Sequence, residues 1–174
     1  MATKLLPVTN IELPNDEWEM KNFKENKAFS EETMCFTAVL IHRPTKVRME
    51  IRNDGHGGSD LIMFDQRQPK VQEAMLAWEQ FIADCQPALI ASVAHEEEEW
   101  LRNLYNNSVS AECVIALFTS ELSNQMMLSR KRGTVVRTNA DDDSYRIYKA
   151  TPEQLTGRVQ GQYWNKAIKN WSDL

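Results

Sequence analysis

Residues 34–64 constrain the fold more than any other part of the chain, because their apolar residues follow the spacing of β-strands. The segment 34–41 is a continuous apolar run, typical of a strand covered on both faces. In 46–52, apolar and charged residues alternate, which indicates a strand with one solvated face. A third apolar run, 61–64, follows a glycine-rich segment. These runs predict an antiparallel meander that precedes the helices.

Helical spacing begins after this predicted meander. Residues 68–85 repeat apolar side chains every three or four positions, and 88–106 and 110–133 do the same. Residues 134–149 predict a second hairpin, and 151–171 predict a last helix. Because strand and helix blocks are segregated, we expect an α+β fold. Its small antiparallel sheet would combine the N-terminal meander with the C-terminal hairpin and pack against about four helices.

The length of the chain fits a single domain. It has 174 residues, of which 42% are hydrophobic and 26% charged, as in an ordinary globular protein. Residues 8–33 mix polar residues with isolated apolar ones and show no clear period. The sequence therefore predicts an N-terminal arm over 1–33, packed on a single α+β domain formed by 34–174.

Targeting and cysteine patterns indicate a cytoplasmic protein. The N-terminal residues lack the pattern of a signal peptide, and no run of about 18 apolar residues occurs. The three cysteines, Cys35, Cys85 and Cys113, are odd in number, widely spaced and each in an apolar stretch, so we expect buried thiols rather than disulfides or metal ligands. The sequence predicts no cofactor, no bound metal and no membrane partner.

The loop 53–58 is the most distinctive local feature, since it holds three of the six glycines. One interpretation is a nest of backbone N–H groups for an anion such as phosphate, with His56 and Asp54 as candidates for proton transfer. The other is a glycine-rich hairpin connection, because Asp-Gly and Gly-Gly suit tight turns and the loop lacks the Lys and the hydroxyl of a P-loop. The candidate ligand-binding residues are Asn53, Asp54, Gly55, His56, Gly57 and Gly58.

Charged runs and tryptophans supply candidate residues for binding a partner. The acidic run 96–99 would attract a basic protein surface. The basic run 130–132 closes a predicted helix, and two tryptophans in the last helix are able to anchor a partner. Solvated helix faces and core positions are the alternative interpretations. The candidates are Glu96, Glu97, Glu98, Glu99, Arg130, Lys131, Arg132, Trp164 and Trp171.

Nucleic-acid binding and catalysis receive less support. The formal net charge is −9 over 1–129 and +4 over 130–174, so a basic C-terminal part is a candidate surface for nucleic acid. The low pI of about 5.3 argues against that use. The run 141–143 lacks the glycine and the distal glutamate of a calcium loop, and no G-x-S-x-G motif occurs. The sequence favours a protein that is not an enzyme.

The order of a strand, the loop 53–58, helices and a late hairpin resembles small phage-encoded proteins of uncharacterised function, over about residues 35–150. The resemblance implies a mobile-element context and carries over no catalytic residues. We therefore expect a non-enzymatic protein in the host cytoplasm that binds and inhibits a host or defence machinery. The alternatives are a small nucleotide- or ligand-binding protein or enzyme that uses the loop, and a nucleic-acid binder that uses the basic C-terminal part.

Overall fold

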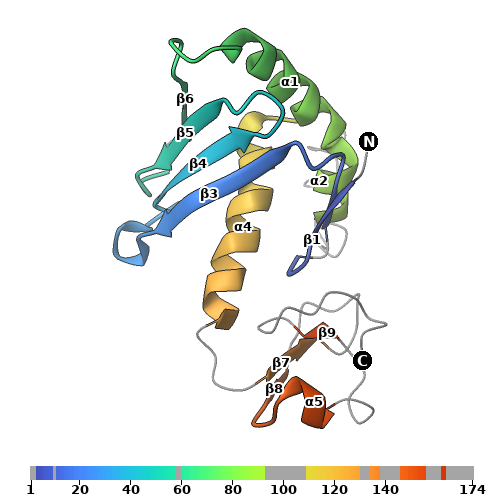
Figure 1. Cartoon of the computed structure of the whole chain (residues 1–174). Helices are drawn as coiled ribbons and strands as arrows, with labels where there is room; N and C mark the ends of the chain where they lie inside the picture. Colours follow the sequence, from blue (N-terminus) through green and yellow to red (C-terminus); the bar gives the residue numbers. More distant parts are fainter. Residues whose placement is uncertain are drawn as a thin grey trace. The chain divides into compact units, whose positions relative to one another are not determined.

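The computed structural model divides the chain into two compact units (Figure 1). The first unit contains 1–4 and 12–119, and the second contains 5–11 and 120–174. Within these units the structure describes residues 3–9, 11–57, 60–92, 109–129, 134–137, 146–155 and 162–163.

A four-stranded antiparallel sheet forms the first unit, in the order β3-β4-β5-β6 (Figure 1). Three of its strands, β4 (Phe36–His42), β5 (Arg48–Asn53) and β6 (Leu61–Phe64), are the meander that the sequence predicts. The fourth, β3 (Trp18–Glu25), lies in a segment for which the sequence shows no period.

A β-bulge explains why the pattern of β3 is hard to see. Trp18 and Met20 are buried and alternate with more exposed residues, as in a strand with one covered face. The pairing register with β4 then shifts between Lys21 and Lys24, and Asn22 has a positive φ of 53°. The extra residue moves the next apolar side chain, Phe23, out of phase with the first two. The alternation is therefore too short to be recognised in the sequence.

The helices correct the predicted arrangement, although the α+β class is right. Among the described residues, the helices longer than one turn are α1 (Val71–Asp84), α2 (Gln86–Ser92) and α4 (Ala111–Ser129), so the expectation of about four helices is wrong. Within the range of the predicted last helix, the described residues form the single helical turn α5 (Pro152–Leu155) and the strand β9 (Gln162–Tyr163). None of the described helices has the length and apolar character needed to cross a membrane.

The C-terminal hairpin does not extend the first sheet. Strands β7 (Thr134–Arg137) and β8 (Arg146–Tyr148) pair with each other, and β9 joins them in a separate three-stranded sheet of order β8-β7-β9. Tyr163 pairs with Val136, and this non-local pairing replaces the helix that the local sequence favours. One predicted sheet is thus two sheets in two units.

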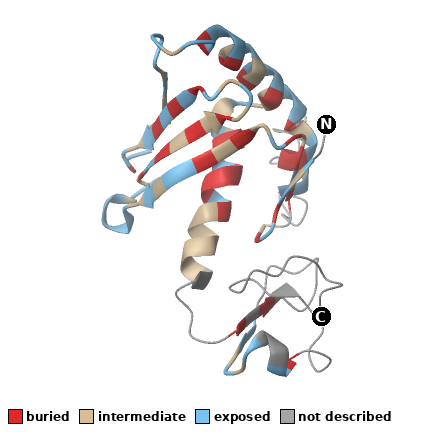
Figure 2. Ribbon diagram, in the orientation of Figure 1, coloured by how far each residue is buried: buried red, intermediate tan, exposed pale blue. Residues whose placement is uncertain are grey.

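Aromatic side chains fill the core of the first unit. The ring of Trp18 on β3 lies 4.9 Å from that of Trp78 and 6.2 Å from that of Phe81, both on α1. Phe81 in turn lies 6.3 Å from Phe118 on α4. Along β4 and β5, buried residues alternate with exposed or half-buried ones (Figure 2), so the prediction that the strand in 34–41 is covered on both faces is wrong. The helices therefore pack against one face of the sheet, which we call the inner face.

A buried carboxylate joins the N-terminal residues of the second unit to helix α4. The strands β1 (Lys4–Leu6) and β2 (Ile11–Leu13) pair in a two-stranded sheet. Between them, the N–H groups of Val8 and Thr9 donate to the carboxylate of Glu121 at 3.0 and 2.8 Å. The Thr9 hydroxyl and the Gln125 amide also donate to it. Glu121 is only 2% exposed, and among the described residues these four donors stabilise its carboxylate.

Candidate functional site

The glycine-rich loop is fixed to the connection between β3 and β4. The carbonyl oxygen of Gly55 accepts hydrogen bonds from the N–H groups of Glu31, Glu32 and Thr33 at 3.1, 3.0 and 3.3 Å. Gly55 is buried and has a φ of 90°, and a Cβ at this position would lie 1.9 Å from the carbonyl oxygen of Phe29. The sequence therefore needs glycine here for a close approach of two backbone segments.

The N–H groups of the loop are already occupied. The N–H of Gly55 donates to the Asn53 side chain at 2.8 Å, and that of His56 donates to Asp54 at 3.1 Å. The N–H of Gly57 donates to the Thr33 hydroxyl at 3.4 Å. Such local side-chain bonds are typical of Asx turns. They favour the interpretation of the loop as a structural connection, because an anion would have to displace them.

Of the remaining candidate residues, only His56 belongs to the described part of the chain. His56 lies on the surface with its Nδ1 3.3 Å from the Glu31 carboxylate, which is also exposed. Gly58 lies outside the described residues, as do the acidic run 96–99, the basic run 130–132 and the run 141–143. Trp164 and Trp171 also lie outside them.

The four strands leave a large exposed surface opposite the inner face, which we call the open sheet face. Its side chains alternate with more buried ones along each strand, and none of the described helices covers them. Among its apolar members, Leu61 is 41% and Met63 39% exposed. The open sheet face consists of Glu19, Lys21, Lys24, Thr37, Val39, Ile41, Arg48, Glu50, Arg52, Leu61 and Met63.

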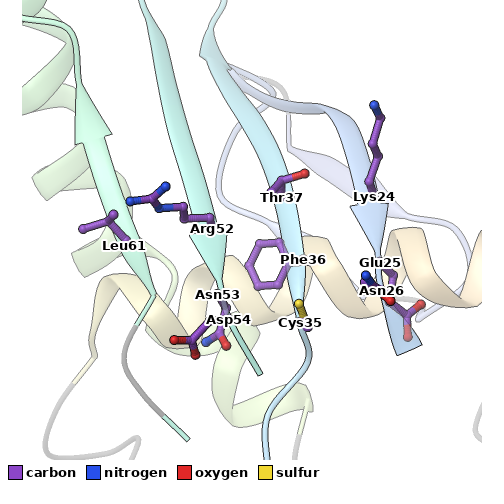
Figure 3. A pocket seen from close by; sticks show the side chains of 10 residues that line it. All are labelled: Lys24, Glu25, Asn26, Cys35, Phe36, Thr37, Arg52, Asn53, Asp54 and Leu61. Carbon is purple, nitrogen blue, oxygen red and sulfur yellow. The ribbon is translucent and has the colours of Figure 1, made fainter. Parts of the chain in front are cut away.

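Two adjoining hollows lie on or beside the open sheet face. One, with a volume of about 670 Å³, opens where β4 begins and β5 ends, next to Asn53 and Asp54 (Figure 3). The other, of about 570 Å³, lies over the middle of the face. The two share Lys24, Thr37 and Arg52 in their linings. Two members of the predicted loop site, Asn53 and Asp54, thus border the larger hollow. The three residues shared by both hollows were not among the candidates predicted from the sequence.

These three residues were missed because their signal is ambiguous. Lys24 lies in a segment that shows no period, and Thr37 is a single polar residue within an apolar run. Arg52 is at an alternating position, which predicts a solvated face and nothing more specific. Only the strand register shows that Lys24, Thr37 and Arg52 are neighbours.

The described residues contain no group of three or more His, Cys, Asp or Glu side chains arranged to hold a metal ion. The cysteines are free thiols, of which Cys85 is buried and the other two are half-buried. Burial raises the pKa of the Cys85 thiol to about 12, so this group stays protonated at neutral pH and is a poor nucleophile.

His42 is a buried titratable group in the core of the first unit. Its ring stacks on Trp18 with 4.7 Å between ring centroids, and its Nδ1 lies 2.9 Å from the Thr45 hydroxyl oxygen. Its Nε2 is 3.7 Å from the Glu17 carboxylate, too far for a hydrogen bond, and has no hydrogen-bond partner among the described residues. Burial lowers the pKa of His42 below its ordinary value of 6.5, and Glu17 opposes that shift only in part.

We expect the first unit to lose stability as the pH falls through 6.5. The unfolded chain then binds a proton at His42 that the folded chain resists, so the penalty begins near pH 6.5 and is complete below the lowered pKa of the folded state. The measurement is the urea midpoint of tryptophan fluorescence between pH 7.5 and 5.5. In the variant His42→Gln, the urea midpoint should depend less on pH over this range. If it falls as steeply as in the wild-type protein, His42 is not the cause of the loss of stability.

Comparisons with protein-family models, with curated proteins and with solved structures give no match to this chain.

Proposed function

We propose that this chain is a non-enzymatic binding protein whose open sheet face docks on another protein. The observation that carries the proposal is the composition of the open sheet face. Apolar side chains lie there next to charged side chains of both signs. Val39 and Ile41 lie in its centre, with Met63 beside them on the edge strand β6. A sheet face turned only to water would carry polar residues at these positions.

The composition of this face suits a protein partner better than a nucleic acid. Single-stranded nucleic acids are held by exposed aromatic rings, on which the bases stack. The aromatic residues of these strands instead belong to the inner face. Trp18 and Phe36 are buried, Phe23 lies 5.9 Å from Phe36, and Phe64 packs against a buried cluster. The partner that fits is a protein surface with an apolar centre and charges at its rim.

The biological role follows from the phage-like order of elements in the sequence. We expect the partner to belong to a host or defence machinery, and the chain to inhibit it by covering a functional surface. A protein of this kind needs no catalytic residues of its own.

A pull-down experiment tests this proposal. The tagged protein is incubated with bacterial lysate at low and high salt, and retained proteins are identified by mass spectrometry. We expect one stoichiometric partner, which the variant Met63→Glu loses because the substitution places a charge among the apolar residues of the contact.

The matched control is Leu76→Glu. Leu76 lies on α1, away from the open sheet face, and is 66% exposed, so this variant carries the same kind of substitution elsewhere. It should retain the partner. If Met63→Glu retains the partner, or if both variants lose it equally, the open sheet face is not the docking site.

A further inference from the structure

We infer that Lys24, Thr37 and Arg52 form a binding site for a phosphate group, at the end of the open sheet face next to the glycine-rich loop. The site does not depend on a protein partner, and its ligand would be inorganic phosphate or a small phosphate monoester.

The strand register brings these residues together. Lys24 on β3 lies opposite Thr37 on β4, and Thr37 lies opposite Arg52 on β5. Neighbouring strands are about 4.8 Å apart, so the two cationic residues lie on either side of the threonine hydroxyl. Figure 3 shows the three side chains projecting from three adjacent strands.

The charge of this cross-strand row differs from that of the other rows on the face. The row of Glu19, Ile41 and Arg48 holds one charge of each sign.

The row of Lys21, Val39, Glu50 and Met63 is balanced in the same way. By contrast, the row of Lys24, Thr37, Arg52 and Leu61 carries two positive charges and no negative one.

The two cations of this row are available for a ligand. Among the described residues, neither Lys24 nor Arg52 forms an ion pair with a carboxylate. The adjacent carboxylate on β3, Glu25, pairs in register with the buried Phe36 and lies 3.7 Å from Lys27, although it also lines the larger hollow. Glu50 follows the same face of β5 but does not approach Arg52 within 4.0 Å.

The chemistry of the row matches a phosphate group. A phosphate monoester carries close to two negative charges at neutral pH, which two cations neutralise. The arginine fork donates two parallel hydrogen bonds to such a group, the lysine supplies a point charge, and the threonine hydroxyl donates a further bond. The hollows of about 670 and 570 Å³ on either side leave room for the organic part of an ester.

Three acidic groups limit where such a ligand sits. Glu25 and Asp54 line the larger hollow and Glu50 the smaller one, so each repels an anion placed away from the row. The phosphate is therefore expected over Thr37, between the two cations, with any hydroxyl or amino groups of the ester directed to these carboxylates.

The test is an NMR titration at pH 7.5 and constant ionic strength, with inorganic phosphate, adenosine 5′-monophosphate and adenosine as probes. We expect both phosphates to cause saturable shifts centred on Lys24, Thr37 and Arg52, and adenosine to cause none there. Equal affinities would identify free phosphate as the ligand, and tighter binding of the nucleotide would identify a monoester.

Paired variants decide whether the row itself is responsible. The double variant Lys24→Gln, Arg52→Gln should bind both phosphates about tenfold more weakly or worse, because two charge-assisted contacts are lost. The control, Lys21→Gln, Arg48→Gln, removes the same charge from the same face and should keep the affinity. Equal loss in both, shifts that do not saturate, or the same shifts with adenosine would overturn the inference. The affinity of Met63→Glu for phosphate should be unchanged, which separates this site from partner binding.

Discussion

Replacing Gly55 with Ala is expected to lower the free energy of unfolding of the first unit by about 3–5 kcal/mol. The new Cβ would lie 1.9 Å from the Phe29 carbonyl oxygen, which is backbone and cannot rotate away. Moving the loop would break the three hydrogen bonds that the Gly55 carbonyl accepts from residues 31–33. Urea unfolding followed by tryptophan fluorescence measures the effect, since Trp18 and Trp78 lie in this unit.

Gly57→Ala is the matched control for this prediction. Gly57 also has a positive φ, 77°, but its Cβ would meet only the flexible end of the Glu32 side chain. We expect a loss of about 1 kcal/mol, mainly from the backbone conformation. If the two substitutions cost the same, the close contact of the loop with the β3–β4 connection is not what requires glycine.

Glu121→Ala is expected to destabilise the second unit by about 3 kcal/mol. Without the carboxylate, the N–H groups of Val8 and Thr9 lose their acceptor, and Val8 is only 5% exposed. Hydrogen exchange of these two amides should accelerate most, because their protection depends directly on Glu121.

An exposed glutamate on the same helix, Glu112, provides the comparison. Glu112→Ala should leave the exchange of the Val8 and Thr9 amides unchanged. If Glu121→Ala leaves their exchange unchanged as well, the hydrogen bonds from Val8 and Thr9 to this carboxylate do not protect the N-terminal segment in solution.

Local periodicity was enough to predict part of the fold. The meander of β4, β5 and β6 and the helix α1 were predicted from apolar residues at the spacing of strands and helices. The continuous apolar run of β4 nevertheless misled on packing, because one of its faces is open. Strand β3 escaped recognition because its bulge changes the phase of the alternation after Lys21. The separate C-terminal sheet escaped it because the pairing of β7 with β9 joins residues far apart in sequence.

The sequence predicted only the residues at one edge of the candidate site, Asn53 and Asp54. The glycines of the loop mark an unusual backbone, but their role depends on Phe29 and on residues 31–33, whose position the local sequence does not specify. Alternation in 46–52 identifies the two faces of β5, whereas the continuous apolar run of β4 does not identify its faces. The sequence does not show which face of the sheet the helices leave uncovered. It also does not show that Lys24 and Arg52 share a row, because this depends on how the strands pair.

Lysine labelling of the complex tests most directly whether the open sheet face is the docking surface. The protein is acetylated alone and with the partner that it retains, and the modified lysines are quantified by mass spectrometry. Lys21 and Lys24 lie on the open sheet face, whereas Lys46 and Lys70 are exposed elsewhere in the first unit. We predict that the partner protects Lys21 and Lys24 and leaves Lys46 and Lys70 reactive. Protection of Lys46 or Lys70, with Lys21 and Lys24 still reactive, would contradict the proposed function.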